Sequence, residues 1–139
     1  FDKDKFIEKL KFVYPAIGMA NTTLIPKEKQ TFLEDSFKEI VKKMDEDTIR
    51  KLLYFFTGTP GLINDPSKDY NIVFNNGEFG LREPDLTQPK KSDERFPLAH
   101  ACFNQLVLPN YSEEKITGEN IMEKKILFAI NNADGFDFA

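Results

Sequence analysis

The sequence predicts a small α+β domain in which helices pack on a short, few-stranded sheet and are followed by a C-terminal helix and a tail. Segments with apolar residues at helical spacing stand at both ends, and short apolar runs bounded by Gly, Pro and Asn lie between them. The length of 139 residues, with 40% hydrophobic and 30% charged residues, suits one compact soluble domain.

Four segments are predicted to be helical because their apolar residues form one stripe. One of them follows Asp45 or Asp47, either of which can cap a helix, and ends at Gly58, which can adopt a left-handed conformation. The other three predicted helices are residues 4–14, 27–44 and 119–133.

Three short segments are predicted to be strands. They are residues 70–74, residues 79–82 and the apolar run at 105–108. Asn75-Asn76-Gly77 predicts a hairpin between the first two, because Asn and Gly tolerate positive φ. Residues 83–95 carry Pro and many charges, so they are predicted to form a surface loop.

The composition argues against several classes of partner. The net charge of −4 and the pI of about 5.1 leave no basic stripe, so neither nucleic acid nor an anionic membrane surface is an expected partner. No apolar run approaches the ~20 residues of a membrane span. The chain begins without a secretory leader and without Met, so we expect it to be part of a longer protein.

Cys102 is the only cysteine and His100 the only histidine. An internal disulfide and a Cys/His zinc site are therefore excluded, and a free thiol suits a reducing cytosolic or nuclear location. By itself, a lone cysteine among Ala, Phe and Leu is typical of a small buried hydrophobic residue.

The segment around this cysteine has a more specific pattern. Residues 96–111 read Phe-Pro-Leu-Ala-His-Ala-Cys-Phe-Asn-Gln-Leu-Val-Leu-Pro-Asn-Tyr. This resembles the active-site run of HECT-type ubiquitin ligases, Leu-Pro-x-Ala-His-Thr-Cys-Phe-Asn-x-Leu-x-Leu-Pro-x-Tyr. Residues 51–59 are similar to the family's Lys-Leu-Leu-x-Phe-x-Thr-Gly-Thr segment, and residues 126–130 with Gly135-Phe136 resemble its terminal helix and tail.

The resemblance implies a domain division and an activity. Residues 25–139 would form the small C-terminal lobe of the family, and residues 1–24 the end of the preceding lobe with the hinge. Cys102 would accept ubiquitin as a thioester from a ubiquitin-conjugating enzyme, which binds the missing lobe, and would pass it to a lysine of a protein substrate. No cofactor or metal is implied.

The roles of the other residues in these segments remain open at this stage. In extended backbone His100 and Cys102 point to the same face, so His100 either acts as a local base or shapes the loop through hydrogen bonds from its ring to the backbone. The resemblance implies that Phe136 positions the lobe during transfer, and the alternative is an aromatic ring packed on its own domain. Asn104 is expected to fix the loop through a bond to the backbone, and the alternative is a contact with the bound ubiquitin tail. Phe103 and Leu106 are expected to lie in the core.

Two departures from the family pattern suggest an alternative function. Ala101 stands where the family has Thr, and the segment after Thr59, which begins Pro60-Gly61, does not have the family's usual arrangement of Pro and paired Gly. The alternative is a degenerate lobe that binds ubiquitin or another protein without chemistry. A thiol hydrolase is disfavoured, because the single His has no Asn or Asp partner at a suitable spacing.

Overall fold

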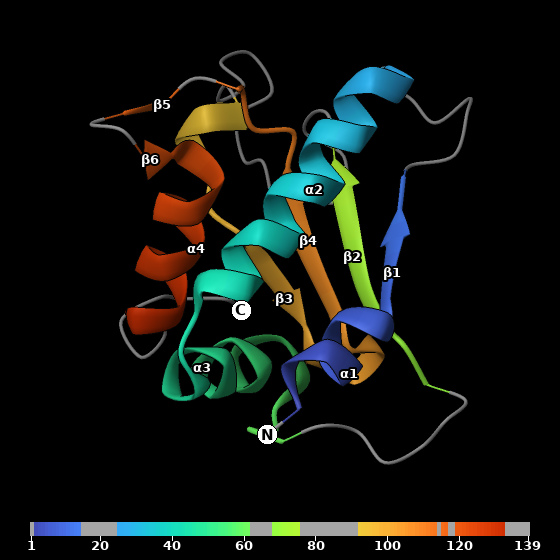
Figure 1. Ribbon diagram of the computed structural model, residues 1–139, viewed down its shortest axis with the longest axis vertical. Helices are drawn as coiled ribbons and strands as arrows, with labels where there is room; N and C mark the ends of the chain where they lie inside the picture. Colours follow the sequence, from blue (N-terminus) through green and yellow to red (C-terminus); the bar gives the residue numbers. More distant parts are fainter. Residues whose placement is uncertain are drawn as a thin grey trace.

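The computed structural model describes residues 2–14, 25–61, 68–75, 92–113, 115–116 and 119–132. Within these residues the chain forms four α-helices, two short 3-10 helices, a four-stranded mixed sheet and a small two-stranded sheet, which confirms the α+β class (Figure 1). The elements are α1 (Lys3–Glu8), β1 (Leu10–Val13), α2 (Lys27–Lys43), α3 (Glu46–Thr57), β2 (Tyr70–Asn75), η1 (Ser92–Glu94), β3 (Leu98–His100), η2 (Ala101–Phe103), β4 (Gln105–Pro109), β5 (Lys115–Ile116), β6 (Glu119–Asn120) and α4 (Ile121–Asn131).

The main sheet has the strand order β1-β2-β4-β3. Strands β1, β2 and β4 run parallel, and β3 pairs antiparallel with β4. Because β2 and β4 are parallel, the start of β2 lies beside the start of β4, where the β3–β4 hairpin turns. This register determines which side chains reach the cysteine segment.

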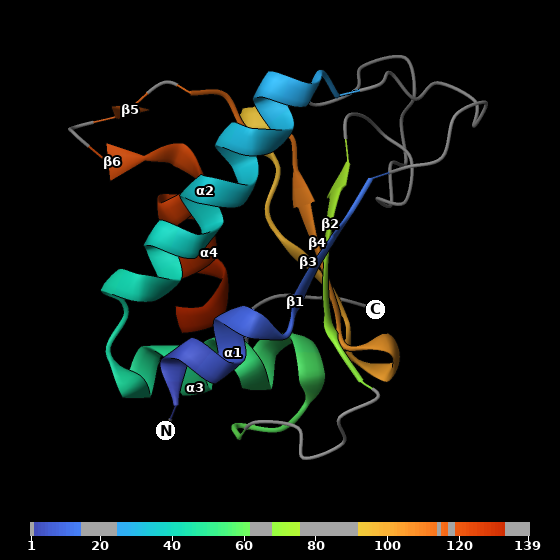
Figure 2. The ribbon, with the colours of Figure 1, turned by 45° about the vertical axis from the view of Figure 1, so that its right-hand side comes forward.

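The helices cover one face of the sheet, which Figure 2 shows nearly edge-on. Strand β2 explains this arrangement, since Tyr70, Ile72 and Phe74 are fully buried whereas Asn71 and Val73 are only partly buried. Side chains alternate between the two faces of a strand, so β2 offers one apolar face to the helices. The helices contribute buried residues that include Leu33, Phe37, Leu52, Phe56 and Ile126.

The N-terminal segment departs from the predicted helix over residues 4–14. Helix α1 ends at Glu8, and β1 then pairs with β2 in the register Leu10↔Tyr70 to Val13↔Val73. Residues 10–14 also fit a period of two, because Phe12 packs on the core while Lys11 is exposed. The ring of Phe12 stacks 5.9 Å from that of Phe74, so strand pairing prevails over the local helical pattern.

The second and third predicted helices are confirmed as α2 and α3. The Oδ1 atom of Asp45 accepts a hydrogen bond from the N–H of Thr48 at 2.8 Å and caps α3. Hydrogen bonds from Thr48, first from its hydroxyl and then from its backbone, hold the pKa of Asp45 below its ordinary value. Gly58 ends α3 in the left-handed conformation with φ 84°.

Other predictions are confirmed or fall outside the described residues. The strand at 105–108 is confirmed as β4, and the last helix as α4, which begins later than predicted because Asn120 caps it. Strand β2 is confirmed, but it lies between β1 and β4 in the sheet. The predicted strand at 79–82, Asn76-Gly77 and Gly135 lie outside the described residues. At the end of the predicted 83–95 loop the structure has η1 and a buried Arg95.

None of the described helices combines the length and the apolar character that a membrane crossing requires.

Candidate active site

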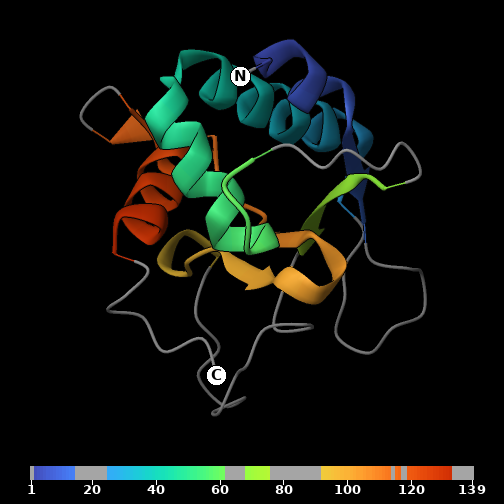
Figure 3. The ribbon, with the colours of Figure 1, turned by 90° about the horizontal axis from the view of Figure 1, so that it is seen from below.

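Cys102 lies at the tip of the β3–β4 hairpin. His100 and Gln105 form the last pair of the ladder, and residues 101–104 make the turn. Cys102 is exposed, as the sequence predicts for a reactive thiol. Figure 3 shows the turn beside the C-terminal end of α3, which contacts both β3 and η2.

The turn is held by hydrogen bonds within itself and from the neighbouring strand. The N–H of Asn104 donates to the carbonyl oxygen of Ala101 at 3.1 Å. From β2, the N–H of Asn71 donates to the carbonyl oxygen of Asn104 at 2.9 Å, and its side-chain Nδ2 donates to the carbonyl oxygen of Phe103 at 3.2 Å. Two consecutive carbonyls that follow Cys102 are therefore fixed by one residue of β2.

The sequence analysis did not single out Asn71. The only feature that could have drawn attention to Asn71 is that it is a polar residue on the partly exposed face of an otherwise apolar strand. The role becomes visible only when the parallel register places Asn71 opposite Gln105, next to the turn.

Asn104 fixes the turn through its backbone conformation. It has φ 49° and is the only non-glycine residue with positive φ among the described residues. Asn is more tolerant of the left-handed region than most residues, because its short polar side chain bonds locally. Asn104 therefore contributes a left-handed backbone position to the turn, whereas the side-chain hydrogen bond to the loop backbone that the sequence suggested stays a prediction.

Two expectations about this segment are wrong and one is confirmed. Leu106 is fully buried, but Phe103 is 70% exposed and does not lie in the core. Residues 101–103 form the 3-10 helix η2 before β4 begins, so Phe103 belongs to the exposed turn and not to the buried strand. For the same reason the extended-backbone argument for His100 and Cys102 fails.

His100 and Cys102 nevertheless share one exposed turn. His100 is the last residue of β3 and precedes η2. Within the described part of the chain, neither its ring nor the Cys102 thiol makes a hydrogen bond. Phe136, the third predicted site residue, lies outside the described residues.

Hydrogen bonds connect the Leu-Pro-Asn-Tyr segment at the end of β4 to the residues before β3. Tyr111 is fully buried, and its hydroxyl donates to the carbonyl oxygen of Arg95 at 2.7 Å. Burial, and then the nearby Asp93 carboxylate, raises the pKa of Tyr111. The N–H of Ser112 donates to Oδ1 of Asp93 at 2.8 Å. These bonds tie the end of β4 to the residues that lead into β3.

The Thr-Gly-Thr segment ends α3 where it meets the turn. The hydroxyl of Thr57 donates to the carbonyl oxygen of Leu53 at 2.7 Å and accepts from the N–H of Thr59 at 3.2 Å. With Gly58 in the left-handed conformation, the chain leaves α3 sharply. This segment therefore terminates the helix that supports β3 and η2.

Comparison with known proteins identifies the family. Residues 18–139 match the family described as HECT-domain (ubiquitin-transferase). The chain belongs to this family. The HECT cysteine segment predicted from the sequence is thus the segment that forms the β3–η2–β4 turn.

Proteins similar to this chain are named E3 ubiquitin-protein ligases. The chain is 34% identical over 105 residues to E3 ubiquitin-protein ligase UPL2 of Arabidopsis thaliana, which covers 74% of this chain and 3% of that protein. It is 35% identical over 104 residues to E3 ubiquitin-protein ligase ptr1 of Schizosaccharomyces pombe. The matched part is 74% of this chain and 3% of that protein. It is 30% identical over 100 residues to the probable E3 ubiquitin-protein ligase HECTD2 of Homo sapiens. The matched part is 72% of this chain and 11% of that protein. The chain thus spans a small part of these relatives.

Proposed function

We propose that this HECT-family chain is the catalytic C-terminal lobe of a ubiquitin ligase and that Cys102 carries ubiquitin as a thioester. The observation that supports this most directly is the single thiol of the chain, exposed at the tip of a hydrogen-bonded turn. The names of the similar proteins support the same activity for this chain.

The proposed reaction has two acyl-transfer steps. The Cys102 thiolate attacks the thioester carbonyl of ubiquitin on a conjugating enzyme, a new carbon–sulfur bond forms, and the enzyme's cysteine leaves as a thiolate. A substrate lysine, as the free amine, then attacks the Cys102 thioester. The amide bond forms, Cys102 leaves as a thiolate, and the amine proton passes to solvent or a nearby base.

The geometry of the turn suits this chemistry. The first step exchanges one thioester for another and is nearly thermoneutral, so the protein has to expose the sulfur and hold it in place. The exposure of Cys102 meets the first need, and the bonds from Asn71 meet the second. A free thiol suits a reducing compartment, so we propose a cytosolic or nuclear location.

We propose that His100 shapes the turn rather than acting as the base. Its backbone closes the β3–β4 ladder opposite Gln105, whereas its exposed ring makes no hydrogen bond within the described residues, neither to the loop backbone, as the sequence analysis expected, nor to the Cys102 thiol. His100→Gln should therefore keep most of the transfer activity, and its rate should change with pH as the wild-type rate does. A loss of more than about 100-fold, in the range of general-base removal, would assign the base role to His100.

A non-catalytic binding lobe is the second candidate, and Ala101 is the observation that favours it. Ala101 begins η2 and is exposed beside Cys102, so this chain lacks the hydroxyl that the family pattern places there. The second candidate predicts ubiquitin binding that does not change when Cys102 is replaced.

The experiment that separates the two candidates uses the full-length protein that carries this chain, a charged conjugating enzyme and labelled ubiquitin. Non-reducing gels would compare wild type with Cys102→Ala and Cys102→Ser. The proposal predicts a reductant-sensitive adduct in wild type, none in Cys102→Ala and a reductant-resistant oxyester in Cys102→Ser. Ala101→Thr serves as the matched control, because it restores the family residue next to an intact thiol. An adduct that persists in Cys102→Ala would disprove the assignment.

A further inference from the structure

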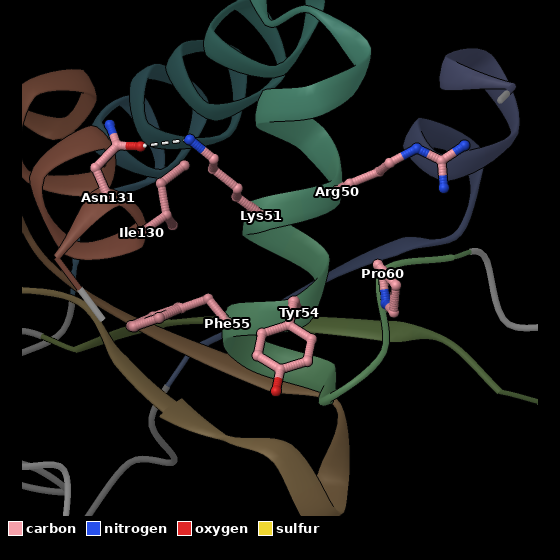
Figure 4. Close-up of a pocket in the computed structure, with 7 residues that line it drawn as sticks. All are labelled: Arg50, Lys51, Tyr54, Phe55, Pro60, Ile130 and Asn131. Carbon is pink, nitrogen blue, oxygen red and sulfur yellow. Dashed lines mark hydrogen bonds between the residues drawn. The ribbon is translucent and has the colours of Figure 1, made fainter. Parts of the chain in front are cut away.

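A groove between α3 and α4 is not used by the proposed reaction. Its volume is about 400 Å³, and Tyr54 at its surface is 63% exposed (Figure 4). Such a large exposed ring in a hollow is typical of a binding surface. The groove is lined by Arg50, Lys51, Tyr54, Phe55, Pro60, Ile130 and Asn131.

The lining combines apolar surface with positive charge. Arg50 and Lys51 are cations, and none of the lining residues is acidic. Lys51 Nζ donates to the neutral Oδ1 of Asn131 at 3.3 Å, a contact that leaves its charge in place (Figure 4). Arg50 pairs with Glu46 at 3.0 Å, but both side chains are about half exposed, so this pair is weak in water. The chemistry favours an occupant with acidic and aromatic side chains.

The residues that follow α4 have this composition. Residues 133–139 read Ala-Asp-Gly-Phe-Asp-Phe-Ala, with two acids, two Phe and no cation. They begin next to the groove, because Ile130 and Asn131 at the end of α4 form one of its walls. Seven residues reach at most roughly 23 Å when extended, which is ample for a groove that starts where the tail starts.

We propose that residues 133–139, named here the tail, bind in the α3–α4 groove of the same chain, with Phe136 against Tyr54 and Phe55. Asp134 and Asp137 flank Phe136 and face Arg50 and Lys51. Because the tail is tethered at the rim, its effective concentration is in the millimolar range, so even weak contacts populate the bound form. The proposal rests on the groove and the tail sequence alone, and it stands whether or not Cys102 carries ubiquitin.

The arrangement would place the tail on the helix that supports the cysteine turn. Helix α3 contacts both β3 and η2, so a tail held along α3 lies on the same helix as the Cys102 turn. Phe136 would then pack on its own domain, which is one of the two roles that its sequence pattern allows.

The test is amide NMR on the isotopically labelled 139-residue chain at low salt. Phe136→Ala should shift the resonances of Lys51, Tyr54, Phe55 and Asn131, and the tail amides should move to random-coil values. Asp134→Asn with Asp137→Asn should shift the same resonances in the same direction by a smaller amount. Phe128→Ala is the matched control, because Phe128 is a 48% exposed Phe on α4 that does not line the groove.

A second measurement leaves the tail aromatics intact. In a Cys102→Ala background, Ala139→Cys can be labelled with a nitroxide, since the chain then holds no other thiol. The label should broaden the groove amides strongly and those at the start of α2 little. The proposal is overturned if Phe136→Ala shifts only residues 132–139, or if the nitroxide leaves the groove amides sharp. It is also overturned if the groove shifts disappear on dilution, because the occupant would then be the tail of a second copy.

Discussion

Asn71 of β2 donates its backbone N–H to the carbonyl oxygen of Asn104 at 2.9 Å and its side-chain amide to that of Phe103 at 3.2 Å. A residue of the neighbouring strand thus donates hydrogen bonds to the carbonyl oxygens of the two residues that follow Cys102. The turn that presents the thiol is therefore anchored to the interior of the sheet and not to its own hairpin alone.

Asn71→Ala should slow ubiquitin transfer to Cys102 without blocking access to the thiol. The backbone bond remains, the side-chain bond is lost, and the expected decrease in rate is about 3- to 10-fold, since a neutral hydrogen bond contributes about 1 kcal/mol. The rate at which a small electrophile alkylates Cys102 should stay within about twofold of the wild-type rate, because the thiol is already exposed.

Val73→Ala is the control for this experiment. Val73 lies on the same strand and the same partly buried face but makes no bond to the turn. Equal losses of transfer in both variants would show that the effect comes from general weakening of β2 and not from positioning of the turn.

Asn104 should tolerate Gly but not Val. Its φ of 49° costs a residue with a Cβ about 1–2 kcal/mol, and more when the Cβ is branched. Asn104→Gly should keep the urea unfolding midpoint close to that of wild type, whereas Asn104→Val should lower it and reduce transfer. A Val variant as stable as the Gly variant would mean that the turn does not require the left-handed conformation.

Residues that interact with near neighbours were predictable from the sequence, and those with distant partners were not. The caps Asp45 and Gly58 bond within a few residues, so their roles follow from local pattern. Cys102 was identified through the length of its motif, although a lone cysteine carries little information. Asn71 and β1 were missed because their roles depend on the parallel pairing of strands far apart in the sequence.

The error at Phe103 has a different cause. The prediction placed Phe103 in the core because it is a large apolar residue, but the 3-10 turn η2 leaves its ring 70% exposed. No glycine or proline within residues 101–104 marks this turn, since Asn104 supplies the positive φ instead.

Tyr111→Phe should destabilise the domain even though the ring is kept. The hydroxyl is buried and bonds the carbonyl oxygen of Arg95, so its removal leaves that buried acceptor without this donor, at a cost of about 1–3 kcal/mol. Urea unfolding measures the loss. Tyr54→Phe is the matched control. Because Tyr54 is 63% exposed, the loss of its hydroxyl should leave the free energy of unfolding nearly unchanged. Similar values for the two variants would contradict a supporting role for Tyr111.

Removal of residues 1–24 tests the predicted start of the lobe at residue 25. Phe6 is fully buried, with its ring 4.9 Å from that of Tyr70, and β1 pairs with β2. Deletion should therefore cost at least the roughly 3 kcal/mol typical of removing a buried Phe, and it should expose the edge of β2.

Unfolding of chains 1–139 and 25–139 in urea would show this loss. Phe6→Ala in the longer chain separates the contribution of the ring from that of the strand. Equal stability of the two chains would support residues 1–24 as a hinge that is independent of the lobe.

The cap of α3 should make stability depend on pH in the acid range. Hydrogen bonds from Thr48 lower the pKa of Asp45 in the folded state, so the folded protein favours the carboxylate more than the unfolded chain does. This contribution is fully present above the unfolded value, about pH 4, and is lost as the pH falls through the lower folded value. Asp45→Asn keeps a capping side chain without the charge, so the other titrating groups cancel in the comparison. The wild type should have the higher urea midpoint at pH 6, and the two midpoints should converge as the pH falls through the lowered folded-state pKa of Asp45. A difference that stays constant over this range would show that the charge of Asp45 does not stabilise α3.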